Sequence, residues 1–432
     1  MIPRGTPDIG WLDLLAGLGY GLLPDTRSRA QAVVEGRWSP HRDTLACLSV
    51  RSGFDLLLHV LALPVGTEVL VSAITIPDMI QLLVHHGLVP IPVDLDPDTL
   101  AVDPTKIHQL VSPRTKAILV AHLFGSRMPL DQLIEVAQQH SLLVIEDCAQ
   151  AYDASSYRGH AQSDISMFSF GPIKMQTALG AALLRVRDRS LLARLRQRQA
   201  GYPRQSRLMF MQRVARFMVL KLLARPWLFA LLIALCRLRG IDHDALLNQA
   251  TRGFSGTDLI GRLRQQPCAP LLRLLDRRLR YADPRRIRHR AQVLSSMVRQ
   301  HPPLKHPGAG ARQHTQWVIP VESRDPDRLV HLLQAHGFDA TRKASRLVVV
   351  PPPQQRPRVT TPHAERMVRQ LVYLPVAPAM SHAAIARVRQ IILDFEHRYT
   401  DAAGTMAAAP PDAAIDRAEQ ATLPGDARSP RR

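Results

Sequence analysis

The chain has 432 residues, of which 46% are hydrophobic, enough for one large or two medium domains with a buried core. Its formal net charge of +20 favours contact with anions such as phosphates, nucleic acid or an anionic membrane surface. Only 5% of the residues are aromatic and no nucleic-acid-binding signature is present, so we expect no nucleic-acid partner.

Cysteine usage and the N-terminal sequence favour a cytoplasmic protein. The four cysteines lie far apart and form no CxxC pair and no metal-ligand spacing, which predicts reduced thiols. The first residues, MIPRGTPDIGWLDLLAG, lack the charged start and the uninterrupted apolar core of a signal peptide. We expect a cytoplasmic location, with peripheral attachment to the inner face of the membrane as a further option.

After an N-terminal segment (1–45), residues 46–200 alternate between helical and strand patterns. Helices are expected over 52–63, 76–87, 104–113 and 129–141, and short apolar strands over 66–73, 88–96, 115–125 and 142–151. Such alternation predicts an α/β domain whose mostly parallel sheet is covered by helices on both faces.

Polar residues are expected at the carboxyl ends of these strands, where ligands bind in such sheets. Asp147 and Gln150 follow one strand directly. The turn formed by Arg51, Ser52 and Gly53 begins a helix and is a natural cradle for a phosphate.

Residues 204–240 differ from what precedes them, because they are apolar and studded with arginine. The longest uncharged run, from Pro226 to Cys236, is too short to span a bilayer, and Lys221 and Arg225 interrupt the sequence before it. Two interpretations stay open. The segment is either a helical insertion packed on the protein or a partner subunit, or an amphipathic helix pair on an anionic membrane.

Three further segments complete the expected organisation. Residues 201–300 are expected to hold the basic, hydrophobic insertion and interdomain helices, and 301–400 alternate again, which predicts a smaller C-terminal α/β domain. After residue 400 the chain is rich in Ala, Pro and Asp, and we predict a disordered tail over 401–432.

Lys174 has an unusual setting, because it follows an apolar strand pattern and a Gly-Pro turn in the stretch ISMFSFGPIKM. An apolar environment lowers the pKa of a lysine, and a neutral amine can form a Schiff base with an aldehyde or ketone. The alternative is a surface lysine on a turn. Asp147 changes the balance, because a carboxylate at the end of a buried strand needs a cationic partner such as a pyridinium nitrogen.

Ser169 and the turn at Ser52 and Gly53 could hold a phosphate. Together with Lys174 and Asp147 they supply the parts that a pyridoxal phosphate site needs. No metal site is expected, because isolated histidines such as His85, His86 and His122 are more often surface or core residues. The arginine-rich run over 277–290 is read as the solvated face of a helix.

Collinear motifs make the segment from about 50 to 187 resemble the DegT/DnrJ/StrS aminotransferases, which are fold-type I pyridoxal phosphate enzymes. The motifs are RSGFDLLLHVLAL, GTEVLVSAITIPDMIQLLVHHGLVPIPVDLD, TKAILVAHLFGSRMPLDQLIEVAQQHSLLVIEDCAQA and SDISMFSFGPIKMQTALGAALLRV. The resemblance implies a large domain with a seven-stranded type of sheet and a smaller C-terminal domain. It also implies a homodimer with the active site at the subunit interface.

The same resemblance implies roles for individual residues. Lys174 would carry the cofactor as a Schiff base, Asp147 would pair with the pyridine nitrogen, and Gln150 would lie near the 3-hydroxyl group. The phosphate would be held by Ser169 and by backbone N–H groups, those of Gly53 and Phe54. The reaction implied is transfer of an amino group from an amino acid donor, for which glutamate is a candidate, to a keto-sugar or another biosynthetic keto or aldehyde acceptor.

Several positions depart from the family pattern. Phe54 stands where threonine is usual, Ile76 or Thr75 takes the place of a stacking aromatic residue, and Ala379 replaces a glycine near the C-terminus. A loop that reaches across the dimer has at most a remnant in RGFSGTDLIGRL, and 204–240 is an insertion. These departures leave two alternatives open: a scaffold that keeps the fold and binds a membrane surface, or another pyridoxal phosphate reaction such as dehydration.

Overall fold

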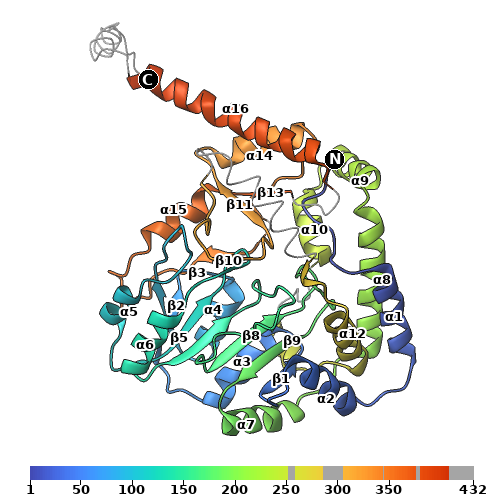
Figure 1. The fold of residues 1–432 in the computed structure, drawn as a ribbon, viewed down its shortest axis with the longest axis vertical. Helices are drawn as coiled ribbons and strands as arrows, with labels where there is room; N and C mark the ends of the chain where they lie inside the picture. The colour runs from blue at the N-terminus through green and yellow to red at the C-terminus, as the bar shows by residue number, and fades with distance from the viewer. Residues whose placement is uncertain (252–257, 286–304, 344, 376–379, 408–432) are drawn as a thin grey trace, which may run out of the picture.

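The computed structural model describes residues 1–251, 258–285, 305–343, 345–375 and 380–407 (Figure 1). A seven-stranded sheet in the order β1-β9-β8-β7-β5-β2-β4 forms its centre. Its strands are β1 (Thr44–Cys47), β2 (Glu68–Ser72), β4 (Val89–Val93), β5 (Thr115–Ala121), β7 (Leu143–Asp147), β8 (Ile165–Ser169) and β9 (Ala182–Val186). The pairs from β4 through β8 are parallel, and β9 runs antiparallel to both of its neighbours. The mostly parallel α/β fold predicted from the sequence is therefore confirmed.

Apolar side chains cover both faces of this sheet. Along β2, Val69 and Val71 join one buried cluster while Leu70 between them joins another, as strand geometry requires. The first cluster includes residues of α3 (Val50–Leu61), α4 (Pro77–His85) and α7 (Arg189–Ala200). The second includes residues of α5 (Pro104–Leu110) and α6 (Asp131–Gln139).

Helix α3 packs closely against Leu184 of the sheet at Gly53, which has no side chain. A Cβ atom at this position would come within 2.7 Å of Leu184 on β9. The helix begins at Ser49, whose side chain accepts a hydrogen bond from the N–H of Ser52. The N-terminus of α3 is thereby held at the end of the sheet where the site is built.

A group of helices forms one flank of the molecule (Figure 1). They are α1 (Trp11–Leu22), α2 (Arg27–Trp38), α8 (Arg207–Leu223), α9 (Pro226–Leu238), α10 (His243–Thr251) and α12 (Ala269–Arg280). The short helix α11 (Leu259–Leu263) packs instead against α3. Helix α1 packs against α8 and α12, and Gly21 lets it approach Met211, which a Cβ atom would meet at 2.5 Å. Among the described residues no single helix could cross a membrane, but α8 and α9, bent by 96°, reach the required length and apolarity as a pair.

The smaller C-terminal domain is built on β11 (Ile319–Glu322) paired antiparallel with β13 (Leu371–Leu374). Its helices are α14 (Pro326–Ala335), α15 (Pro362–Gln370) and α16 (His382–Ala407). Two short ladders join it to the large domain: β10 (Gln313–His314) pairs with β6 (Ser126–Arg127), and β12 (Val348–Val349) pairs with β3 (Ile74–Thr75). Helix α16 continues past residue 400 into the segment predicted to be disordered, and 408–432 and Ala379 lie outside the described residues.

Candidate functional site

The site lies where β7 and β8 end, as expected for a parallel sheet. Asp147 is the last residue of β7 and Ser169 the last residue of β8. Lys174 follows in a turn in which its own N–H donates to the carbonyl of Gly171 at 3.0 Å. The turn is tied to the strand by Ser169, whose Oγ accepts a hydrogen bond from the N–H of Gly171 at 3.3 Å. This geometry brings Asp147, Ser169 and Lys174 to one edge of the sheet.

The amino group of Lys174 is partly buried and covered by an aromatic ring. Its Nζ lies 4.1 Å from the centroid of Trp317, and the indole N–H of Trp317 donates to the carbonyl of Ile173 at 3.0 Å. Burial lowers the pKa of Lys174 to about 8, against the opposing charge of Asp147, and the charge of Arg51 lowers it further. At pH 7 about one tenth of the amine is then neutral, far more than for a solvated lysine.

Asp147 is the electrostatic counterpart of this lysine. Burial raises the pKa of its carboxyl, while the N–H of Ala149, which donates at 2.9 Å, and the charges of Lys174 and His122 oppose that rise. The net shift is upward, so the present partners compensate for burial only in part. A further cation beside Asp147 would stabilise the ionised form.

Glu146, one residue earlier, points to the other face of β7 and is fully buried. It accepts hydrogen bonds from Tyr157 Oη at 3.0 Å, from Ser166 Oγ at 2.9 Å and from the N–H of His160 at 2.8 Å, and lies 3.1 Å from His122 Nε2. Burial alone would raise its pKa, but these groups, led by His122, lower it to about 2. Glu146 is thus a structural anchor beneath the site.

His122, Glu146 and Cys148 are the one group in the described part of the chain whose side chains could together hold a metal ion, with ligand atoms within 4.8 Å of one another. His122 already accepts a hydrogen bond from the N–H of Met128 on Nδ1 at 3.2 Å. Burial raises the pKa of Cys148, which keeps the thiol protonated, whereas metals bind the thiolate. The donor set therefore favours a hydrogen-bonded core over a metal centre.

The N-terminus of α3 supplies the candidate anion site. Ser52 Oγ lies 2.9 Å from Ser49 Oγ, and Arg51 forms an ion pair with Asp78 in the first turn of α4. The N–H of Gly53 already donates to the carbonyl of Ser49 at 3.0 Å, and the ring of Phe54 is fully buried in the core. The side chains of Arg51 and Ser52, at the start of the helix, are therefore better candidates for binding an anion than Gly53 and Phe54.

The remaining predicted residues have different surroundings. Gln150 Oε1 accepts a hydrogen bond from the N–H of Phe124 at 2.7 Å, which fixes the loop after β5. Ile76 precedes α4 and packs, partly buried, against the core on the α3 side of the sheet. Neither residue is shown to contact Lys174 or Asp147 in the described part of the chain.

Sequence reasoning missed Trp317 and named Arg51 only as part of the phosphate-binding turn. Trp317 comes from the smaller domain, and no spacing in the sequence connects it with Lys174. In the structure, the charge of Arg51 also acts on Lys174, and its guanidinium pairs with Asp78. A cation immediately before the Ser-Gly turn is the signal that could have identified Arg51.

Comparison with known proteins agrees with this architecture. Residues 37–215 match the model of the DegT/DnrJ/EryC1/StrS aminotransferase family. This segment belongs to that family. It contains α3, the strands of the central sheet from β1 to β9, and all the predicted site residues. The fold-type I class expected from the sequence is confirmed.

Individual relatives cover part of the chain. GDP-perosamine synthase of Caulobacter vibrioides is 35% identical over 158 residues, which are 36% of this chain and 42% of the relative. The L-glutamine:2-deoxy-scyllo-inosose aminotransferase of Streptomyces kanamyceticus is 35% identical over 127 residues, 29% of this chain and 30% of the relative. The chain therefore matches less than half the length of either relative.

The fold likeness extends further than the sequence likeness. The solved structure of the aminotransferase TlmJ from Streptoalloteichus hindustanus has a TM-score of 0.66 and covers 93% of this chain and 99% of its own, at 18% identity. Both domains therefore share the architecture of that enzyme, including the region after residue 215 that the family model does not reach.

Proposed function

We propose that this protein is a pyridoxal 5'-phosphate-dependent aminotransferase that transfers an amino group to a keto-sugar or another biosynthetic keto or aldehyde acceptor. One observation carries the proposal: the partly buried amine of Lys174, with a pKa of about 8, lies in the field of the Asp147 carboxylate, at the strand ends of a family segment. A solvated lysine on a turn would not combine these properties.

The residues present fit the cofactor. Asp147 is a partly buried carboxylate with a raised pKa and would pair with a protonated ring nitrogen. Ser52, Ser169 and Arg51 would hold the phosphate near the start of α3, where the helix dipole favours an anion. Trp317 offers an aromatic face beside Lys174, although the family's usual aromatic position holds Ile76.

When bound, pyridoxal phosphate withdraws electrons from the carbon that bears the amino group. The chain's own residues supply the rest. Lys174 holds the cofactor and is placed to take a proton from the substrate carbon and return it, as a base and then an acid with a pKa near the working pH. Asp147 keeps the ring nitrogen protonated, and Trp317 excludes water from the amine.

Two arguments support the substrate class. The relatives are named for a sugar nucleotide and for an inosose, and one of their names includes L-glutamine. The chain's formal net charge of +20 would attract an anionic acceptor. We propose an amino acid donor such as glutamate, and a homodimer in which the partner subunit completes the site.

The deciding test is spectroscopic. The purified protein incubated with pyridoxal phosphate should develop an absorbance band near the violet edge of the visible range, and Lys174→Ala should abolish it. Lys116→Ala, which removes an exposed lysine on β5, is the control and should keep the band. A wild-type protein that never acquires the band would overturn the proposal.

A second measurement separates transfer from other reactions of the same cofactor. Glutamate or glutamine should convert the band, and mass spectrometry should then detect an aminated keto-sugar. Cofactor binding with no amine transfer to any acceptor would contradict an aminotransferase and point to a reaction such as dehydration. Sedimentation at several protein concentrations tests the homodimer.

A further inference from the structure

Helices α8 and α9 share one pattern of buried and exposed residues. Phe210, Val214 and Phe217 are buried along α8, and Phe229, Ile233 and Cys236 are buried along α9 with identical spacing. This spacing places each buried set on one helical face. The opposite face of each helix points away from the protein.

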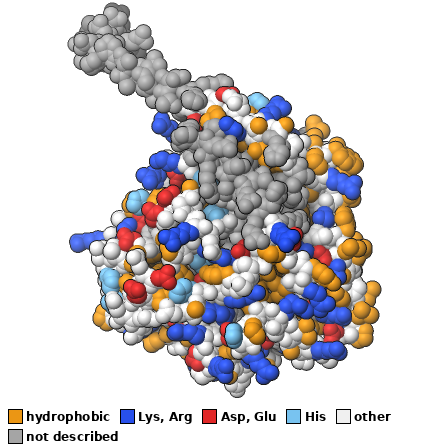
Figure 2. Space-filling view, in the orientation of Figure 1, with side chains coloured by type: hydrophobic (Ala, Val, Ile, Leu, Met, Phe, Trp, Pro, Cys, Tyr) orange, Lys and Arg blue, Asp and Glu red, His pale blue; other side chains and the backbone are white. Residues whose placement is uncertain are grey.

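The outward faces are apolar as well. Along α9, Trp227 is 66% exposed, Leu231 is 54% exposed and Leu238 is 83% exposed, and their spacing puts them on one stripe. Helix α8 adds further exposed apolar residues: Leu208, Met209, Val219 and Leu222. In Figure 2, hydrophobic side chains gather along this edge of the molecule, over the positions of α8 and α9 in Figure 1.

Helix α1 extends the same flank. It packs against α8, and it exposes apolar residues of its own: Trp11, Leu12, Leu15, Leu22 and Leu23. We name the exposed apolar residues of α1, α8 and α9 the flank surface. Single exposed apolar residues scattered over a surface are normal, whereas the flank surface gathers many of them on three neighbouring helices.

The charged residues of α8 and α9, the larger part of the flank surface, have one sign. From Arg189 to Ile241 the chain has 12 basic residues and no Asp or Glu. Among them, Arg216, Arg225, Arg237 and Arg239 are exposed. Exposed apolar side chains interleaved with arginine, without acidic residues, are typical of helices that lie in the interface of an anionic bilayer.

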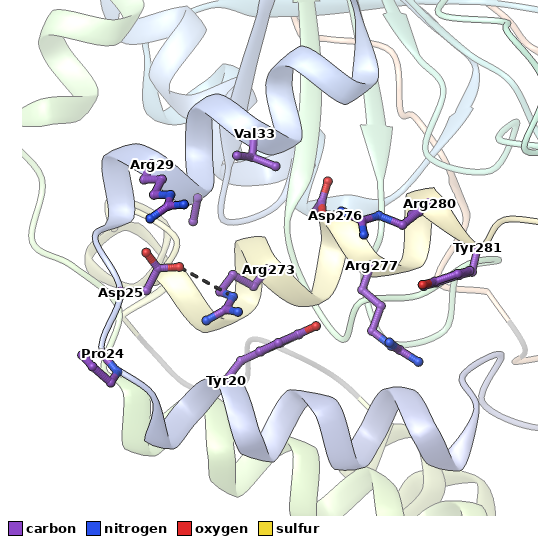
Figure 3. Close-up of a pocket in the computed structure, with 11 residues that line it drawn as sticks. Tyr20, Pro24, Asp25, Arg29, Val33, Arg273, Asp276, Arg277, Arg280 and Tyr281 are labelled. Atoms are coloured by element: carbon purple, nitrogen blue, oxygen red, sulfur yellow. Dashed lines mark hydrogen bonds and ion pairs between the residues drawn. The ribbon is translucent and has the colours of Figure 1, made fainter.

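A basic groove adjoins the flank surface. It has a volume of about 460 Å³, and α1, α2 and α12 line it with four arginines against two aspartates (Figure 3). The residues are Arg29, Arg273, Arg277, Arg280, Asp25 and Asp276. None of them belongs to the candidate active site, and α1, which carries Tyr20 into the groove, also contributes to the flank surface.

We propose that the flank surface docks this protein onto an anionic lipid bilayer, with α8 and α9 lying in the interface rather than crossing it. Their axes meet at 96°, and two helices that meet at a corner can lie flat in one plane. The apolar stripes enter the boundary between headgroups and acyl chains, while the arginines contact lipid phosphates. This docking goes beyond the proposed transfer reaction and does not depend on it.

Vesicle co-sedimentation of the full chain tests the proposal. The wild-type protein should bind vesicles of phosphatidylcholine with phosphatidylglycerol, bind phosphatidylcholine alone at least about tenfold more weakly, and release at high salt. Failure to bind the anionic vesicles, or equal binding to both kinds at low and high salt, would overturn it.

Variants identify the surface. Combined replacement of the α9 stripe should lower anionic vesicle binding at least about tenfold: Trp227→Ser, Leu231→Gln, Leu235→Gln and Leu238→Gln. The matched control changes two exposed valines elsewhere, Val65→Gln and Val84→Gln, and should bind as the wild type does. Equal binding by the stripe variant and the control would contradict the proposal.

The arginines need a control of their own. Replacing Arg216, Arg225, Arg237 and Arg239 by Gln should weaken binding and its salt dependence, whereas replacing Arg312, Arg324, Arg328 and Arg358, which are also exposed, should change neither.

A second copy of the chain is the competing occupant. If the stripe variant turns a dimer into a monomer while the wild type ignores vesicles, the flank surface is a subunit interface and the proposal fails.

Discussion

The strand-end site and the flank surface come from neighbouring parts of the chain but show opposite relations between side chains and solvent. At the site, the buried carboxylate of Glu146 has at least four hydrogen-bonding partners, and Lys174 lies under an aromatic ring. On the flank, Trp227 and Leu238 face outward. A buried polar group is costly unless it is hydrogen-bonded within the fold, whereas a large exposed apolar patch marks a surface that binds another molecule.

The largest effect is expected at Asp147. Asp147→Asn removes the charge that raises the pKa of Lys174 and that, in the proposed function, would pair with the ring nitrogen, so transfer should slow by roughly 10²- to 10⁴-fold. Single-turnover rates with saturating cofactor measure this effect. Asp131→Asn, on an exposed residue of α6, is the control. A rate for Asp147→Asn close to that of the wild type would mean that the charge of Asp147 does not contribute to transfer.

The next effect concerns stability beneath the site. Glu146→Gln leaves the donors around it without their charged acceptor and should cost about 3–5 kcal/mol of unfolding free energy. The folded-state pKa of Glu146 is about 2, below the ordinary 4.5, so its contribution is complete above pH 4.5 and is lost as the pH falls toward 2. Urea unfolding across this window should show a weaker acid dependence for the variant. Glu135→Gln, on the exposed side of α6, should behave as the wild type does.

Gly53 gives a smaller effect with a steric cause. Gly53→Ala would place a methyl group within 2.7 Å of the end of the Leu184 side chain, so either Leu184 or α3 must shift, at a cost of about 1–3 kcal/mol. We expect α3 to shift, because Leu184 is fully buried in the core, and the shift would move Ser52 and lower the affinity for pyridoxal phosphate together with stability. Gly36→Ala, where a Cβ atom meets nothing within 4 Å, is the matched control. Unchanged cofactor affinity in Gly53→Ala would show that the start of α3 does not bind the phosphate.

The smallest effect is expected on the flank itself. Leu231→Gln changes a side chain that is 54% exposed, so the free energy of unfolding should change by less than about 0.5 kcal/mol. Ile233→Gln, two residues along on the buried face, should cost several times more. Thermal or urea unfolding of the two variants compares the faces directly. A large loss for Leu231→Gln would show that the outward face is covered within the protein.

The sequence predicted the large domain well because its strands and helices carry strong periodicity and their ends carry polar residues. Asp147 and Lys174 could be connected because parallel strands end at one edge of a sheet, so sequence position implies proximity. Trp317 could not be predicted, because it reaches the site through the packing of a second domain. The N–H of Gly53 was assigned to the phosphate from the motif, whereas the helix register gives it to Ser49.

For residues 204–240 the sequence predicts the helices but not which of their faces is buried. The sequence predicted helices there, and α8 and α9 are present. Periodicity could not decide which apolar face turns inward, because both faces of each helix are apolar. That choice depends on the packing of α1 against α8 and on a corner of 96° between α8 and α9, and neither is encoded in a local pattern.

The indole of Trp317 makes the reactivity of Lys174 conditional on correct assembly of the two domains. Burial is the main influence that lowers the pKa of this lysine, and part of that burial comes from a residue carried by the smaller domain. A chain whose smaller domain is not yet docked would hydrate the amine and return its pKa toward the ordinary 10.5. At that pKa a far smaller share of the amine is neutral near pH 7, so Lys174 should react more slowly with carbonyl compounds until the smaller domain is docked.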